Sequence, residues 1–225
     1  MPARLRFDPR LAALLDRLHA ESDAQGGELA SYFGRRAQAG DFDWAAFDDD
    51  ANHFLADKLV ALDRDKAELC HQLCRALRAR RVVEAGTSFG VSTLYLADAI
   101  RANGGGVVIG TEYEPAKARA ARAVFAEADL DDLIDLREGD LRETLREVGG
   151  PVDFMLIDIW TPMARPALER VAPQLRPGAI VVADNTTQFR DAYRDYFAFL
   201  DDPANRFSTV TLPFPGGLEL SVRLD

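Results

Sequence analysis

Two carboxylates and an amide occupy positions where they could hold a divalent metal ion. Asp158 ends the apolar run that contains Leu156 and Ile157, and Asp184 and Asn185 end a second apolar run. If both runs are parallel strands, their carboxyl ends meet at one edge of a sheet. Oxygen ligands of this kind suit Mg²⁺, whose remaining positions go to water and substrate. A lone Asp at a strand end is more often a helix cap or a turn residue. We take the pair with its adjacent amide to predict a magnesium site.

A glycine turn stands earlier in the chain, in the segment 82–92, VVEAGTSFGVS. Gly86 and Gly90 allow a sharp bend from strand to helix and a close approach of a ligand to the backbone. A dinucleotide site would need G-x-G-x-x-G to hold a pyrophosphate. Here the spacing is G-x-x-x-G and Glu84 precedes it, which disfavours a pyrophosphate and suits a cationic ligand. A turn that serves only backbone geometry is the alternative for this loop taken alone.

Two further acids follow the next two strand-like runs. Glu112 ends the run VVIGTE, and Asp140 follows Gly139 in the segment REGD. A carboxylate after the second strand can accept both ribose hydroxyls of an adenosine. A solvated carboxylate is the alternative, but the glycine loop in the preceding unit favours ribose binding. Asp140, or the backbone amides beside it, could contact the edge of an adenine.

The elements that position these residues follow from hydrophobic periodicity. After residue 80, short β-branched runs alternate with helical segments, which predicts a mostly parallel, doubly wound sheet with helices on both faces. The segments 207–214 and 218–224 flank the turn Pro215-Gly216-Gly217. We therefore predict a Rossmann-like α/β fold of seven strands, whose last strand is antiparallel and lies at the sheet edge.

The part of the chain before residue 80 is predicted to be helical. Asp8 and Pro9 are typical of a helix cap and first turn and precede an amphipathic segment over 11–22. A longer amphipathic run predicts a helix over about residues 50–78. Within it, Cys70 and Cys74 share one helix face and could form a metal or redox pair. Because Leu69, Leu73 and Leu77 lie on the same helix, we favour packing as small apolar groups.

Composition narrows the classes of partner. The 225 residues include 37 acidic and 27 basic side chains, a net charge of −10 that would repel a phosphate backbone, so we expect no nucleic-acid partner. No stretch is apolar over the length of a membrane span. The first residues lack the uninterrupted apolar centre of a signal peptide. We expect a soluble cytoplasmic protein with no membrane partner.

The motifs together carry a family resemblance. The run VVEAGTSFGVSTLYLA, then TEYEP, REGD, MLIDIW and ADN, in this order, resembles the catechol O-methyltransferase family of class I S-adenosylmethionine (SAM)-dependent enzymes, over about residues 60–225. The resemblance implies SAM as cofactor and Mg²⁺ on Asp158, Asp184 and Asn185. It implies that the methionine half lies against the glycine loop, the ribose on Glu112 and the adenine near Asp140. The implied cofactor-binding residues are Glu84, Gly86, Ser88, Gly90, Ser92, Glu112, Asp140, Leu141 and Asp158.

The sequence departs from the family at the catalytic base. In the catechol enzymes a lysine follows the tryptophan of the fourth-strand motif, but here Thr161 follows Trp160. A threonine cannot take a proton near neutral pH. Asp158 and the metal would then activate the hydroxyl. Lys66, aligned with a family lysine before the glycine loop, has two open interpretations, either a catalytic helper or a solvated lysine on the helix surface.

The leading functional interpretation is metal-assisted methyl transfer to a hydroxyl of a small-molecule acceptor. Three alternatives stay open: a metal-independent methyltransferase acting on an amine or carboxylate, a cofactor-binding protein without catalysis, and a nucleotide-dependent oxidoreductase, which the glycine spacing disfavours. We assign residues 61–225 to the SAM-binding domain. The helical segment 1–60 is expected to cover the acceptor or to form the contact of a homodimer.

Overall fold

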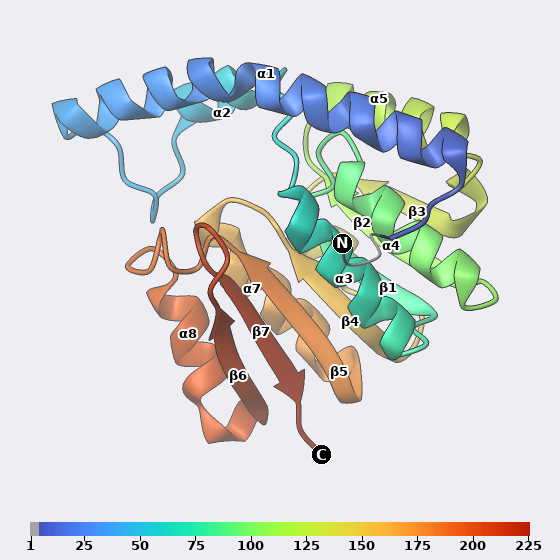
Figure 1. Cartoon of the computed structure of the whole chain (residues 1–225). Helices are drawn as coiled ribbons and strands as arrows, with labels where there is room; N and C mark the ends of the chain where they lie inside the picture. Colours follow the sequence, from blue (N-terminus) through green and yellow to red (C-terminus); the bar gives the residue numbers. More distant parts are fainter. Residues whose placement is uncertain (1–4) are drawn as a thin grey trace.

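Seven strands form one sheet in the computed structural model, which describes residues 5–225 (Figure 1). The strand order is β3-β2-β1-β4-β5-β7-β6, with the first five strands in that order parallel. The chain runs outward from β1 to β3 and then returns to β4 on the other side, which is the predicted doubly wound arrangement. The strands are β1 (Arg81–Ala85), β2 (Val107–Glu112), β3 (Ile134–Glu138), β4 (Val152–Ile157), β5 (Leu175–Asp184), β6 (Phe207–Leu212) and β7 (Leu218–Arg223).

The last strand is antiparallel, as predicted, but its predicted place at the sheet edge is wrong. β7 lies between β5 and β6, so that Leu218 pairs with Asp184 on one side and with Leu212 on the other. The side chains explain this order. Leu218 and Ser221 of β7 are fully buried, whereas residues 208–211 of β6 are exposed. An exposed, threonine-rich strand tolerates the edge, while the more apolar strand is covered on both sides.

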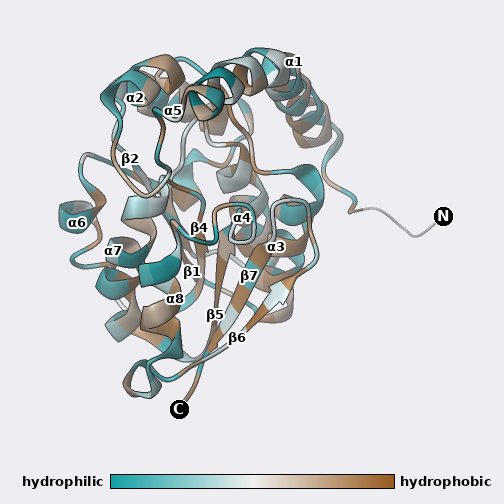
Figure 2. Cartoon of the chain, turned by 90° about the vertical axis from the view of Figure 1, so that its left-hand side faces the viewer, coloured by the Kyte–Doolittle hydropathy of each residue, from teal (hydrophilic) through white to brown (hydrophobic). Residues whose placement is uncertain are grey.

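Helices cover both faces of the sheet and enclose two apolar cores. Alternate strand residues point to opposite faces, so Val82 packs beneath α3, α4 and α5, and Val83 packs against α7 and α8. In Figure 2 the central strands are coloured hydrophobic, between helices with mixed surfaces. The helices are α1 (Pro9–Ala39), α2 (Asp49–Leu55), α3 (Arg64–Ala76), α4 (Val91–Ala102), α5 (Pro115–Glu127), α6 (Leu141–Thr144), α7 (Thr161–Val171) and α8 (Arg194–Asp201).

The first helix begins where the sequence predicts and extends much further. The Asp8 carboxylate accepts a hydrogen bond from the Arg10 amide, and Pro9 occupies the first turn. The helix then runs for 31 residues, to a left-handed cap at Gly40. The first four residues of the predicted segment 1–60 lie outside the described residues.

The predicted continuous helix over residues 50–78 is wrong, because residues 56–63 separate α2 from α3. Leu59 and Leu62 in this connection are buried in the same core as the sheet. Side chains of α1 take the place of helical carbonyls as acceptors. The Leu59 amide donates to Gln25 (3.1 Å), and the Ala61 amide donates to Ser22 (3.0 Å). Tertiary hydrogen bonds and burial thus outweigh the local helical pattern.

The N-terminal helix shares its core with the sheet. Leu11, Leu14, Leu15 and Leu18 belong to the cluster that also contains Val82. Within residues 5–225, no helix is both long enough and apolar enough to span a membrane. Truncating a side chain of α1 should therefore affect the stability of the sheet.

We expect Leu15→Ala to lower the free energy of unfolding by about 2–5 kcal/mol, because Leu15 is 0% exposed and its truncation leaves a cavity. Urea denaturation followed by circular dichroism measures this change. The control Leu224→Ala, at a side chain 45% exposed, should change stability by at most about 0.5 kcal/mol. A separate early transition in Leu15→Ala, with the main midpoint unchanged, would contradict a shared core.

Candidate active site

A cavity of about 740 Å³ lies at the carboxyl ends of β1, β2, β4 and β5. This volume is within the usual range of small-molecule pockets. The strand order reverses between β1 and β4, which is where open α/β sheets bind ligands. The predicted site residues that line the cavity are Gly86, Ser88, Ser92, Glu112, Asp140, Leu141, Asp158, Asp184 and Asn185.

The two glycines of the loop after β1 are required by close backbone packing. Gly86 has φ of 95°, and a Cβ atom there would lie 2.0 Å from the carbonyl oxygen of Asp158. Gly90 has φ of 85°, and a Cβ atom would lie 2.4 Å from the ring of Phe125. Gly86 also faces the cavity, whereas Gly90 packs α4 against α5. The loop thus brings its backbone next to the end of β4.

Glu84 lies beneath this loop and is fully buried. Its carboxylate accepts hydrogen bonds from Thr87 (2.9 Å), Ser92 (2.7 Å) and Thr93 (2.5 Å). Burial raises the pKa of Glu84, and the three hydroxyl donors oppose that shift. The predicted cofactor residues Glu84 and Ser92 are therefore joined to each other. Their bond ties the end of β1 to the first turn of α4.

Glu112 ends β2 at the rim of the cavity and joins two loops. One carboxylate oxygen accepts from the Ser88 amide at 2.7 Å, and the other accepts from the Glu114 amide at 2.8 Å. Each oxygen retains a further lone pair for a ligand hydroxyl. Ser88 has a positive φ of 50°, so this contact orients the turn after Gly86. The predicted residues Ser88 and Glu112 thus lie in contact.

Asp140 and Leu141 line the cavity beyond Glu112. The Asp140 carboxylate accepts from the Arg142 amide at 2.8 Å and from the Arg142 guanidinium. These bonds lower the pKa of Asp140 and hold it ionised at the start of α6. Leu141 is buried and offers an apolar surface.

Asp158 and Asp184 lie on neighbouring strands, because Ile157 of β4 pairs with Ala183 of β5. Both side chains line the cavity. Burial raises the pKa of Asp158 well above its ordinary value, and the negative charge of Asp184 adds to this shift. The two carboxylates therefore come together at one edge of the sheet, as the sequence predicts.

Lys66 is buried beside this pair, with 1% of its surface exposed. Its ammonium nitrogen lies 2.7 Å from Oδ1 of Asp184 and 2.9 Å from Oδ2 of Asp63. Burial opposes the charge of Lys66, but the two ion pairs outweigh burial and raise its pKa. Its interpretation as a solvated surface lysine is wrong. A signal was present in the sequence, because Lys66 is four and eight residues before Cys70 and Cys74, on the helix face that is buried.

Asn185 follows Asp184 with a positive φ of 57°. Its amide nitrogen donates to Oδ2 of Asp184 at 3.0 Å. Its amide oxygen faces the hairpin turn, since a Cβ atom on Gly216 would lie 2.4 Å from it. Among residues 5–225, no three His, Cys, Asp or Glu side chains form a group that could hold a metal ion.

An aromatic cover closes the acidic end of the cavity, which sequence reasoning did not identify. Trp44, in the loop between α1 and α2, has its ring centroid 4.0 Å from that of Phe189 and 6.0 Å from that of Trp160. The buried Thr161 hydroxyl donates to the carbonyl oxygen of Trp44. Thr161, at the position of the missing family lysine, thus anchors this cover. The aromatic residues of segment 42–47 in an otherwise polar stretch were the available signal.

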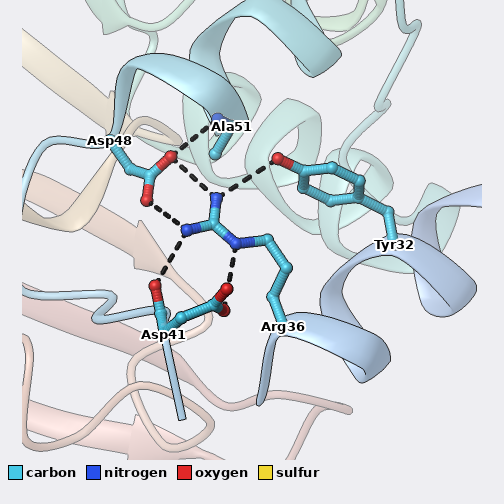
Figure 3. Close-up of polar contacts among 5 residues, drawn as sticks. All are labelled: Tyr32, Arg36, Asp41, Asp48 and Ala51. Carbon is cyan, nitrogen blue, oxygen red and sulfur yellow. Dashed lines mark hydrogen bonds and ion pairs between the residues drawn. The ribbon is translucent and has the colours of Figure 1, made fainter. Parts of the chain in front are cut away.

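One arginine joins both ends of the covering loop, as Figure 3 shows. The Arg36 guanidinium donates to both carboxylate oxygens of Asp48 at 2.8 Å and to the Asp41 carbonyl at 2.8 Å. Asp48 also caps α2 through the Ala51 amide. The Tyr32 hydroxyl lies 3.3 Å from the same guanidinium. Arg36 therefore closes the loop 40–48 that carries Trp44.

Comparison with known proteins agrees with this fold. A methyltransferase domain family matches residues 83–186. Catechol O-methyltransferases from Mycobacterium tuberculosis and Niastella koreensis are 32% and 33% identical over 127 and 122 residues, which cover 56% and 52% of this chain and 57% and 53% of theirs. The chain spans about half the length of these relatives. An O-methyltransferase structure from Bacillus cereus in complex with SAH superposes with a TM-score of 0.70 at 20% identity, over 97% of this chain and 92% of that one.

The cavity lies at the switch point of a doubly wound sheet, and the segment 83–186 that forms much of it matches a methyltransferase domain family. Over about half of its length the chain is similar to catechol O-methyltransferases.

We expect Arg36→Met to loosen the covering loop, because it removes the hydrogen bonds to Asp41 and Asp48 while keeping the apolar stem. Tryptophan fluorescence with acrylamide measures this, since both tryptophans, Trp44 and Trp160, line the cavity. Quenching should increase. The control Arg35→Met removes an exposed guanidinium that bonds only to Ser31 in this structure, and it should leave quenching unchanged. Equal quenching in the wild type and Arg36→Met would refute the role of Arg36.

Proposed function

We propose that this chain transfers the sulfonium methyl group of SAM to an oxygen atom of a small-molecule acceptor. The observation that carries the proposal is the continuity of the cavity. Gly86, Glu112 and Asp140 line one part, and Asp158 lies with the aromatic cover in another. A cofactor and an acceptor can therefore meet inside a single enclosure, as methyl transfer requires. The similarity to catechol O-methyltransferases supports the choice of an oxygen acceptor.

In this proposal the nucleoside lies along the ends of β2 and β3. Glu112 accepts the ribose hydroxyls with its remaining lone pairs, and Leu141 contacts the adenine. The methionine half lies against Gly86 and Ser88. The negative charges of Glu84 beneath the loop and of Asp158 favour a cationic sulfonium. The same charges disfavour the pyrophosphate of a dinucleotide.

The transfer itself is a direct displacement. The acceptor oxygen forms a bond to the methyl carbon as the carbon–sulfur bond breaks, and the electron pair of that bond stays on sulfur, giving neutral S-adenosylhomocysteine. The hydroxyl proton passes to the carboxylate of Asp158. The positive sulfonium nearby favours the ionised form of Asp158 before transfer, against the effect of burial. Trp44, Trp160 and Phe189 exclude water and offer flat apolar surfaces, which suit an aromatic acceptor.

Magnesium assistance, which the family resemblance implies, does not fit the residues present. Oδ1 of Asp184 contacts the Lys66 ammonium, and Oδ2 accepts the Asn185 amide. The amide oxygen of Asn185 faces Gly216. Among the described residues, Asp158 is the only one of the two predicted carboxylate ligands whose oxygens have neither an ion pair nor a hydrogen bond of this kind. We therefore route no step of the reaction through a metal ion.

We expect Glu112→Ala to weaken SAM binding by about 1.5–3 kcal/mol, the scale of lost hydrogen bonds to a charged acceptor. Isothermal titration calorimetry measures the affinity, with NAD as a ligand that should not bind. Glu114→Ala is the matched control, since only its backbone amide contacts Glu112. Unchanged SAM affinity in Glu112→Ala would remove Glu112 from the cofactor site.

Asp158→Asn should weaken SAM binding without abolishing it, because Glu84 and Glu112 remain. At saturating SAM it should lower methyl transfer by about 10²–10⁴-fold, because the amide cannot accept the hydroxyl proton. The assay incubates the protein with SAM and a panel of phenols, aliphatic alcohols, amines and carboxylates, and detects methylated products by mass spectrometry. Products only from amines or carboxylates, or no methylation by a protein that binds SAM, would contradict the proposed O-methyl transfer.

A further inference from the structure

The buried lysine beside the acidic pair has a consequence for metal use. Building on the proposed function, we propose that the Lys66 ammonium pairs with the Asp184 carboxylate where a divalent cation would otherwise bind. The site formed by Asp158 and Asp184 then works without a metal ion. Lys66 touches Asp184 and does not line the cavity. It is therefore a positioning residue that acts on the acceptor site through Asp184.

The ammonium is held in this place by the fold. Lys66 lies in the first turn of α3, whose neighbouring residues Ala67, Cys70 and Cys74 are packed in the core. Its side chain is 1% exposed, and its two ion pairs lie at 2.7 Å and 2.9 Å. A buried ammonium that left these partners would lose both ion pairs without gaining water.

Both carboxylate oxygens of Asp184 already have a polar partner. Mg²⁺ binds carboxylate oxygens at about 2.0–2.1 Å. An ion at that distance from Oδ1 would compete with the ammonium, and one on Oδ2 would compete with the Asn185 amide hydrogen bond. In either place the divalent charge would lie within a few ångströms of a fixed positive charge and be repelled.

The second carboxylate supports the same conclusion. Asp158 follows the strand next to that of Asp184, and both carboxylates line the same cavity. The ammonium therefore lowers the negative potential of the whole pair, and with it the attraction for any divalent ion. Asp63, the other partner of Lys66, is half exposed at the start of α3 and can be solvated. The charge that a metal would contribute is thus supplied by the chain itself.

Removing the Lys66 ammonium should create a cation-binding site at Asp158 and Asp184. Lys66→Met keeps an unbranched apolar side chain and leaves Asp158 and Asp184 as two uncompensated carboxylates in one cavity. We expect this variant to bind Mn²⁺, used as a probe for Mg²⁺, about tenfold more tightly than the wild type or better, because a fixed like charge has been removed. Adding Asp184→Asn to Lys66→Met should abolish the gain.

The experiment measures Mn²⁺ binding to the full chain by electron paramagnetic resonance of the free ion. The wild type should show no saturable binding in the millimolar range, and its SAM affinity and turnover should be unchanged by chelation. Saturable binding of one Mn²⁺ to the wild type, removed by Asp184→Asn, would overturn the inference. Lys66→Met that folds and gains no Mn²⁺ would also count against it. If that variant does not fold, the wild-type measurement still decides.

The Lys66 inference and the proposed function can fail separately, and the measurements distinguish the two failures. Calorimetry with SAM and product detection on the same samples report cofactor binding and methyl transfer. A failure of the proposed function would appear as no SAM binding or no methylated oxygen product. A failure of the Lys66 inference would appear as Mn²⁺ bound by the wild type, whether or not turnover is seen.

Discussion

The loop after β1 and the end of β4 approach so closely that only a glycine fits between them. A Cβ atom on Gly86 would lie 2.0 Å from the carbonyl oxygen of Asp158. This approach places the glycine turn and the Asp158 carboxylate in one cavity. The parallel pairing of β1 with β4 sets the distance, and the positive φ of Gly86 turns the chain away before it collides with β4. Other parts of the site are arranged around this contact.

Buried polar groups then hold the walls of the cavity in place. Glu84 is fully buried and has three hydroxyl partners, which satisfy a carboxylate that burial would otherwise penalise. Glu112 performs the same task at the rim with two backbone amides. Lys66 and Asp184 form the third such group. Each partnership joins segments from different strands or helices, so the cavity is shaped before any ligand arrives.

The cover of the cavity depends on the segment that precedes the sheet. Arg36 closes the loop that carries Trp44, and Thr161 holds that loop to the start of α7. Thr161 stands where the resembling family has a lysine base, and here its side chain holds the loop that covers the cavity. The proton-accepting role then falls to a carboxylate in our proposal, and the positive charge beside the acids comes from α3.

Local patterns in the sequence determined the sheet, the glycine loop and the strand-end acids. Alternation of β-branched and helical runs, turn residues and caps act over a few residues, so they can be read without the fold. Only the tertiary structure decided the burial of Lys66, the anchoring role of Thr161, the break at residues 56–63 and the place of β7 inside the sheet. The Lys66–Asp184 and Thr161–Trp44 bonds join residues 118 and 117 positions apart. Contacts of that separation depend on how layers pack, and no periodicity along the chain encodes them.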